Sequence, residues 1–203
     1  MNRILLITTL AAAALQLGCS SSEEGVPDKF RVNMDTSKGT VIIEVTKEWA
    51  PIGAERFHEL VKLGYYDQTR FFRVVPGFVA QFGMHGDPAI TAKWSEARLN
   101  DDQPGQSNVR GTVTFATSGP NTRTTQLFIN LANNLNLDKQ GFTPFGKVVE
   151  GMNVVDLFYK GYGEGAPNGQ SPEQGLIRMQ GNAYLHSKFP LLDYIKKATI
   201  VTE

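Results

Sequence analysis

Cysteine is almost absent from the sequence, which has one, Cys19, among 203 residues. A single cysteine excludes an internal disulfide framework, a cysteine-ligated zinc site and a Cys-x-x-Cys redox pair. The three histidines, His58, His85 and His186, are scattered and lack the spacing of metal ligands. No Gly-x-Ser-x-Gly motif is present, so a hydrolase triad has little support. We therefore expect neither a metal nor another cofactor.

Neither sign of charge is in excess. The chain has 20 Lys and Arg against 20 Asp and Glu, which argues against nucleic acid as a partner because phosphate binding usually leaves a basic footprint. No stretch reaches the roughly 18 apolar residues of a membrane span. A hydrophobic content of 41% with 20% charged residues excludes wholesale disorder. The length predicts one folded domain, and its 12 phenylalanines dominate the aromatic residues.

The N-terminus has the pattern of an export signal. One positive charge, Arg3, precedes residues 4–17, which carry no charge and are too few to span a membrane. The run ends in Leu-Gln-Leu-Gly directly before Cys19, and this resembles the lipobox of bacterial lipoproteins. It departs from that pattern at Gln16, where an apolar residue is usual. The alternative is an ordinary cleaved signal peptide in which Cys19 is incidental.

Both alternatives predict export, and the lipoprotein interpretation adds a membrane anchor. It implies that residues 1–18 are a signal peptide and that Cys19 is the lipidated first residue of the mature chain. Residues 19–29 would be a polar tether, and residues 30–203 the folded domain. We expect a location in the cell envelope, facing the periplasm or the exterior, with membrane contact only through the lipid.

Hydrophobic periodicity predicts mostly short strands in the folded part. Phe30, Val32 and Met34 alternate with polar residues, which is the period of a half-buried strand. Further strands are expected over 40–45, 71–75, 78–82, 112–116, 125–131, 145–149 and 198–202. Helices are predicted over 51–64, where Pro51 suits the first turn, and over 153–159.

The remaining segments have weaker patterns. Residues 83–108 and 161–175 are rich in turn-forming residues and are predicted to be loops, and 182–194 is compatible with a short helix. Seven or eight strands with two or three helices indicate a mainly β domain. We expect a closed antiparallel barrel, because closure removes exposed strand edges.

Polar side chains emerge from strands that are otherwise apolar. Arg73 is costly to bury without partners, so it should face the surface, a salt bridge or a ligand groove. Gln81 emerges in the same way from the next strand. Gln126 and Phe128 lie two residues apart and therefore share one face of a later strand. If these strands are adjacent, an arginine, two glutamines and several phenylalanines line one surface.

Four motifs in series carry a family resemblance. Residues 71–83 read Phe-Phe-Arg-Val-Val-Pro-Gly-Phe-Val-Ala-Gln-Phe-Gly, followed by Ser-Gly-Pro-Asn at 118–121, Gln-Leu-Phe-Ile-Asn at 126–130 and Phe-Gly-Lys-Val at 145–148. In this order and spacing they resemble the cyclophilins, the peptidyl-prolyl cis-trans isomerases. The resemblance covers about residues 30–202. It implies a closed eight-stranded antiparallel β-barrel capped by two α-helices, with the substrate groove on its outer face.

The resemblance also implies roles for single residues. Arg73 matches the catalytic arginine, and Gln81 matches the residue that contacts the substrate backbone and steadies that arginine. Four residues match the family's pocket for the proline ring: Phe78, Val79, Phe128 and Leu137. The other substrate-binding positions are Ala116, Thr117, Gln126 and Phe142.

Several positions depart from the better-known eukaryotic pattern. Asn136 stands where many members carry a tryptophan that contacts cyclosporin, which argues against strong cyclosporin binding. Phe142 replaces a common histidine and Thr117 a common asparagine. The stretch 161–194 is also longer than the usual final connection, and the sequence assigns it no function.

Two functions fit this pattern. The first is a peptidyl-prolyl isomerase that assists the folding of exported proteins, a step that slow Xaa-Pro isomerisation limits. The second is a peptide-binding or chaperone-like module that uses the same groove without turnover. Arg73 favours the first, because binding alone needs the pocket but no donor for the transition state. The expected partners are proline-containing peptide segments of exported or unfolded proteins, bound by a monomer.

Overall fold

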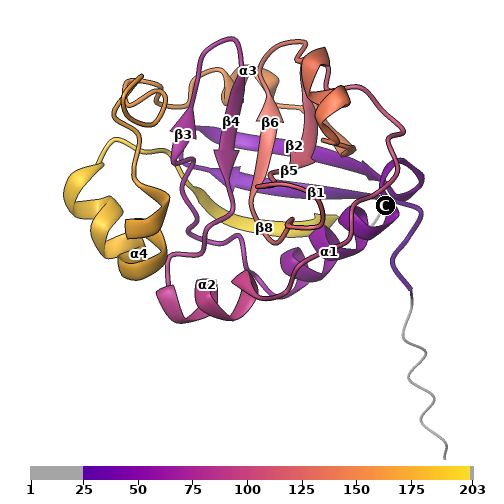
Figure 1. The fold of residues 1–203 in the computed structure, drawn as a ribbon, viewed down its shortest axis with the longest axis horizontal. Helices are drawn as coiled ribbons and strands as arrows, with labels where there is room; N and C mark the ends of the chain where they lie inside the picture. The colour runs from indigo at the N-terminus through magenta and orange to yellow at the C-terminus, as the bar shows by residue number, and fades with distance from the viewer. Residues whose placement is uncertain (1–24, 202–203) are drawn as a thin grey trace, which may run out of the picture.

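A single antiparallel sheet dominates the computed structural model, which describes residues 25–201 (Figure 1). Its eight strands are β1 (Lys29–Thr36), β2 (Gly39–Thr46), β3 (Arg73–Val74), β4 (Val79–Phe82), β5 (Thr112–Phe115), β6 (Leu127–Asn130), β7 (Pro144–Glu150) and β8 (Ile195–Val201). Their order across the sheet is β3-β4-β6-β5-β7-β2-β1-β8. The predicted mainly β, antiparallel fold is confirmed. The predicted signal peptide and Cys19 lie outside the described residues.

The longest strands follow the predicted alternation. β1 and β2 pair antiparallel with Val32 opposite Ile43, and every second side chain of each strand is buried. Their buried faces join a core that receives Phe57 and Leu60 from α1 (Pro51–Lys62), which lies alongside the sheet (Figure 1). Each large apolar side chain buried there contributes about 1.5–3 kcal/mol relative to exposure. α1 begins at the proline, as the sequence predicts.

The other helices differ from the prediction. α2 (Pro88–Ser95) lies inside the predicted loop 83–108, and the Asp87 side chain caps it by accepting a hydrogen bond from Ala89 N at 2.8 Å. α3 (Met152–Val155) is a single turn, and α4 (Gln174–Lys188) begins eight residues before the predicted helix at 182–194. Two short 3₁₀ helices, η1 (Lys47–Trp49) and η2 (Leu135–Gln140), complete the elements of the described residues. The described residues form four α-helices, where the sequence patterns predict two or three.

The sheet curls but does not close. β3 and β8 are its two edges, and no strand pairing joins them within the described residues. The residues just before them meet instead, because Arg70 and Tyr194 form an isolated bridge and Phe71 N donates to Asp193 O at 2.9 Å. The structure thus corrects the predicted closed barrel to an open half-barrel whose ends touch at one short contact.

α4 packs against the outside of this contact through a small core of its own. That core contains Phe72, Met84, Ile177, Leu185 and Leu192, with Tyr162, Tyr184 and Phe189 packed against it. Gly181 breaks the helix at a positive φ of 54°, and a Cβ there would lie 2.0 Å from Gly86 O. Only glycine permits this approach, which places α4 beside α2 and the β3 edge (Figure 1).

No helix within residues 25–201 is both long enough and apolar enough to cross a membrane.

Candidate active site

Strand register places the two predicted catalytic residues side by side. Arg73 on β3 lies opposite Gln81 on β4, and Gln81 in turn lies opposite Phe128 on β6. Opposed residues of antiparallel strands project from the same face. Three short strands therefore bring together residues that are up to 55 positions apart in the sequence (73 to 128).

A chain of hydrogen bonds links the polar residues. Arg73 Nη1 donates to Gln81 Oε1 at 3.0 Å, and Gln81 Nε2 donates to Gln126 Oε1 at 2.9 Å. Gln126 Nε2 donates onward to Gln174 Oε1, in the first turn of α4, at 3.1 Å. Gln81 and Gln126 each accept from one neighbour and donate to the next, so the chain fixes the orientation of both amides.

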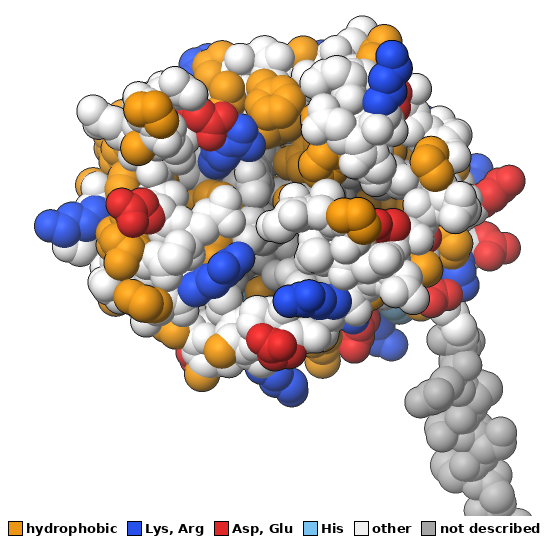
Figure 2. All heavy atoms as spheres, in the orientation of Figure 1, with side chains coloured by type: hydrophobic (Ala, Val, Ile, Leu, Met, Phe, Trp, Pro, Cys, Tyr) orange, Lys and Arg blue, Asp and Glu red, His pale blue; other side chains and the backbone are white. Residues whose placement is uncertain are grey.

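A cluster of apolar side chains, called the apolar pocket below, lies beside the arginine. Its buried residues are Val79, Phe128 and Leu137, and the partly buried Phe78, Ala116 and Phe142 pack against them. The alternate residues Ala80 and Ile129 belong to the main core, so the pocket lies on the opposite, outer face of β4 and β6. Figure 2 shows hydrophobic side chains in a hollow beside the upper end of β6, with charges of both signs around them. Arg73 Cζ lies 5.4 Å from the centre of the Phe78 ring.

The structure brings nine of the ten predicted site residues together in this pocket and polar chain. Thr117 differs, because its hydroxyl bonds within the 117–122 loop, to Gly119 O and to Thr122 Oγ1. It follows Ala116 directly in the chain and has no hydrogen bond to the polar chain within the described residues. The predicted lipidation site, Cys19, lies outside the described residues.

Buried asparagines that the sequence analysis missed hold the pocket in place. Asn134 Nδ2 donates to Phe78 O at 2.8 Å and to Asn130 Oδ1 at 2.7 Å. Asn108 Nδ2 donates to Phe142 O and to Asp138 Oδ1, both at 2.8 Å. Burial acts to raise the pKa of the Asp138 carboxyl, but these hydrogen bonds outweigh it and hold the pKa below its ordinary value. Nothing in the local sequence distinguishes these asparagines from loop residues.

Glu164 is a further residue that the sequence analysis missed. It lies in the predicted loop 161–175, and its carboxylate forms a bidentate ion pair with Arg73, from Nε to Oε1 at 2.5 Å and from Nη2 to Oε2. The pKa of the Glu164 carboxyl is held below its ordinary value by this hydrogen bonding, an effect larger than the opposing effect of burial. A cavity of about 730 Å³ is lined by residues of this loop and of α4 together with Arg73 and Gln81.

The fold and the site together define a class of protein. Its members have a curved antiparallel sheet, and the outer face of that sheet presents an apolar pocket next to an arginine donor. The model of a family described as cyclophilin type peptidyl-prolyl cis-trans isomerase/CLD matches residues 31–179. The chain therefore belongs to the cyclophilin-type peptidyl-prolyl cis-trans isomerases, and it is an enzyme of that type.

Individual relatives agree with this assignment. The chain is 40% identical over 131 residues to a peptidyl-prolyl cis-trans isomerase of Acinetobacter baylyi, covering 62% of this chain and 69% of the relative. It is 33% identical over 155 residues to peptidyl-prolyl cis-trans isomerase A of Dickeya dadantii, covering 74% and 82%.

Solved structures show the same fold. A cyclophilin-type peptidyl-prolyl cis-trans isomerase of Cryptosporidium parvum matches with a TM-score of 0.63 at 23% identity, over 86% of this chain and 99% of that one. Its crystal structure in the presence of the dipeptide Ala-Pro matches with a TM-score of 0.62 at 23% identity, over 85% and 99%. At this identity the likeness is one of fold.

Proposed function

We propose that Arg73 is the catalytic arginine of this isomerase and that the adjacent pocket holds the proline ring of a peptide substrate. The observation that carries the proposal is the position of the guanidinium, hydrogen-bonded to Gln81 and 5.4 Å from the Phe78 ring at the rim of the pocket. A ring held in that pocket presents its nitrogen next to a fixed donor.

The reaction itself needs such a donor. Rotation about an Xaa-Pro bond must break amide resonance, with a barrier of about 18–20 kcal/mol. In the twisted state the proline nitrogen regains its lone pair and can accept a hydrogen bond. A guanidinium placed at that nitrogen binds the twisted amide more strongly than the planar one, which lowers the barrier. An arginine side chain presents its donors in a rigid, planar fork, which suits a donor that must stay at one position.

The remaining residues of the site have supporting roles in this proposal. Phe78, Val79, Phe128, Leu137 and Phe142 enclose the proline ring, which must stay still while the preceding residue rotates. Gln81 steadies the guanidinium through its 3.0 Å bond and contacts the substrate backbone. Gln126, Ala116 and Thr117 line the groove for neighbouring peptide residues.

We further propose that the substrates are exported proteins. The support is the sequence pattern at residues 1–19, which is that of an export signal ending in a cysteine. In this proposal Cys19 carries the lipid, residues 19–29 tether the domain to the cell envelope, and the monomeric enzyme faces the periplasm or the exterior. Slow Xaa-Pro isomerisation limits the folding of such proteins after export.

A protease-coupled isomerisation assay on an Ala-Pro-Phe peptide tests the catalytic role. Because Arg73→Ala removes one donor to the transition state, we expect a loss of about 10²–10³ in kcat/KM. The melting temperature should change little, since the arginine is partly exposed. If the Arg73→Ala protein isomerises the peptide at the wild-type rate, the catalytic assignment is wrong. If the wild type binds the peptide without accelerating isomerisation, the peptide-binding module is the better description.

A further inference from the structure

The segment 164–174 holds both ends of the polar chain in the site. At one end Glu164 pairs with Arg73, and at the other Gln174 accepts from Gln126. The segment belongs to the stretch that is longer than the family's usual final connection, so its contacts with the site need an explanation of their own. Gln81 and Gln126 complete the chain between these two ends.

We propose that Glu164 is a positioning residue that holds the guanidinium of Arg73 in the orientation needed for isomerisation. The inference depends on the catalytic role proposed above for Arg73. A free arginine side chain samples many rotamers, and fixing it beforehand removes that entropy cost from the reaction. A bidentate carboxylate provides the planar, fork-shaped contact that fixes both the position and the plane of a guanidinium.

The count of donors shows why this contact supports catalysis and does not block it. A guanidinium has five N–H groups. Glu164 accepts one from Nε and one from Nη2, and Gln81 accepts one from Nη1. Two N–H groups, one on each terminal nitrogen, have no other acceptor within the described residues. They remain available to the proline nitrogen and the neighbouring carbonyl of a substrate.

The loop is built to hold the carboxylate in place. Gly165 N donates to Glu164 Oε1 at 2.8 Å, and Ser171 N donates to Glu164 O at 3.0 Å, so both the side chain and the backbone of Glu164 are fixed. Gln170 N donates to Tyr162 O at 2.8 Å, which closes the loop on itself. The Tyr162 ring packs at 5.0 Å against Phe189, beyond the end of α4. The loop is therefore anchored to the small core under α4.

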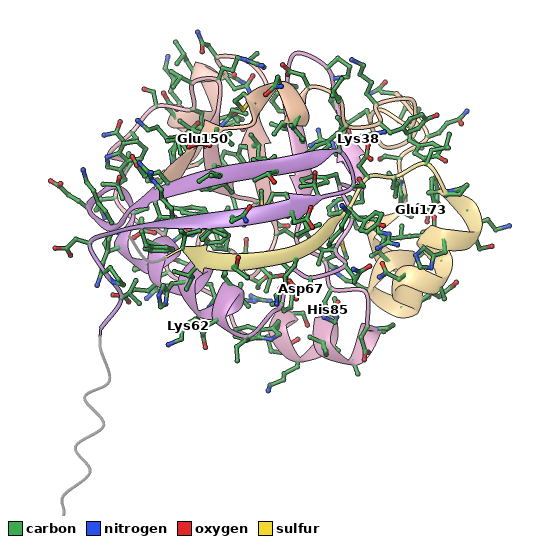
Figure 3. All side chains as sticks on the ribbon, turned by 180° about the vertical axis from the view of Figure 1, so that it is seen from behind. Lys38, Lys62, Asp67, His85, Glu150 and Glu173 are labelled. Carbon is green, nitrogen blue, oxygen red and sulfur yellow. The ribbon has the colours of Figure 1, made fainter. Side chains whose placement is uncertain are left out.

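Glu173 provides a matched control for the test. It lies on the same segment, lines the same cavity and carries the same charge, but its side chain is exposed and makes no bond to Arg73. Figure 3 labels it beside α4. Glu173→Ala therefore removes a negative charge from the cavity without changing the contacts of the guanidinium.

The experiment measures kcat and KM separately for the full chain with Ala-Pro-Phe peptides. We expect Glu164→Ala to lower kcat about ten- to a hundredfold with little change in KM. A loosely held Arg73 guanidinium weakens binding of the transition state but not of the ground-state peptide. Glu164→Gln keeps one acceptor oxygen and should recover part of the rate. Glu173→Ala should match the wild type. In an Arg73→Ala background, Glu164→Ala should cause no further loss, because both changes act through one group.

Two results would overturn the inference. The first is a wild-type or higher kcat in Glu164→Ala, because a higher rate would mean that the ion pair competes with substrate. The second is that Glu164→Ala lowers kcat by the same factor in the Arg73→Ala protein as in the wild type, because the glutamate would then act independently of Arg73. A wild-type rate in Arg73→Ala itself would instead overturn the proposed function, so the two failures are distinguishable.

Discussion

In the proposed function, single residues of the site divide into those that would bind the substrate and those that would act on the rotating bond. Phe128 belongs to the first group, because it is buried in the pocket and its ring meets Phe142 at 5.6 Å in an edge-on contact. Arg73 belongs to the second group, since it lies at the rim with 19% of its side chain exposed. The two kinds of residue should therefore affect different kinetic constants when they are changed.

Removing the floor of the pocket should weaken substrate binding. Phe128→Ala deletes the ring against which a proline would pack, and a buried aromatic side chain of this size contributes about 1.5–3 kcal/mol. We expect kcat/KM to fall about ten- to a hundredfold, mainly through a higher KM. Steady-state kinetics over a range of peptide concentrations measures this, with circular dichroism as the control for folding. A lower kcat at unchanged KM would contradict the role given to Phe128.

The ion pair of Glu164 predicts how the rate depends on pH. Its hydrogen bonds with Arg73 lower the pKa of the Glu164 carboxyl, so the ion pair persists above that lowered pKa and is lost as pH falls through it. We expect kcat to stay constant from pH 7 down to about pH 5 and to fall only below the ordinary glutamate range. NMR exchange measurements on a proline peptide can follow this at acid pH.

Glu164→Gln is the control for this dependence, because it has no proton to gain there. Its kcat should not decrease at acid pH as that of the wild type does, provided that far-UV circular dichroism shows both proteins folded at each pH. If kcat decreases identically at acid pH in the two proteins, the titrating group is not Glu164.

Among the elements, the loop before α4 connects packing to the site. Gly169 packs so closely against the backbone of Glu164 that a Cβ would lie 2.2 Å from Glu164 O and 2.6 Å from Glu164 N. Backbone atoms cannot yield to such a contact, so Gly169→Ala must shift the loop and with it the carboxylate on Arg73. We expect a lower kcat with a nearly unchanged melting temperature, because the loop lies outside the main core.

Gly175→Ala is the matched control for this change, since a Cβ at Gly175 meets nothing within 4 Å. It lies in the first turn of α4, where alanine is also the better helix former. We expect both variants to melt close to the wild-type temperature. Only Gly169→Ala should isomerise the peptide more slowly than the wild type. Equal rates would show that the loop position has no effect on the site.

The elements also show what local sequence can reveal. β1, β2 and α1 were predictable because alternation and an N-terminal proline are visible within one element. α2 was missed because only one of its eight residues, Thr91, is buried, so it carries no clear apolar stripe. The bounds of α4 were missed because a glycine breaks its pattern at Gly181.

The candidate site shows the same division. Arg73, Gln81 and Phe128 could be found because the two-residue period of each strand exposes them among apolar neighbours, and a known family carries the same motifs. The pairing of Glu164 with Arg73 joins residues 91 positions apart in a loop without periodicity. The asparagines that hold Phe78 and Phe142 likewise act through tertiary contacts that leave no local pattern.

For the whole molecule, the curvature of one sheet places the site. The half-barrel keeps Phe57, Phe82 and Phe145 in its interior and leaves Val79 and Phe128 on its outer face. Its open edge at β3 is the place where α4 and its loop dock. The sheet is therefore open at the same edge, β3, where the segment 164–174 contacts Arg73.

The site and the N-terminal segment should be independent of each other. All the site residues lie between 73 and 174, so a chain that starts at residue 25 should keep the kcat and KM of the mature protein. In cells, labelling with a palmitate analogue should mark the wild type and not Cys19→Ala. Labelling of both proteins, or of neither, would contradict the lipid anchor, and a large loss of activity on truncation would contradict the domain boundary.

The central claim is that Arg73 acts on the rotating bond and not on binding. NMR exchange spectroscopy of a saturating Xaa-Pro peptide tests it directly, because one experiment reports both the bound fraction and the cis-trans exchange rate. For Arg73→Ala we predict that the peptide still binds while its catalysed exchange slows by about 10²–10³. Exchange at the wild-type rate in that variant would contradict the account.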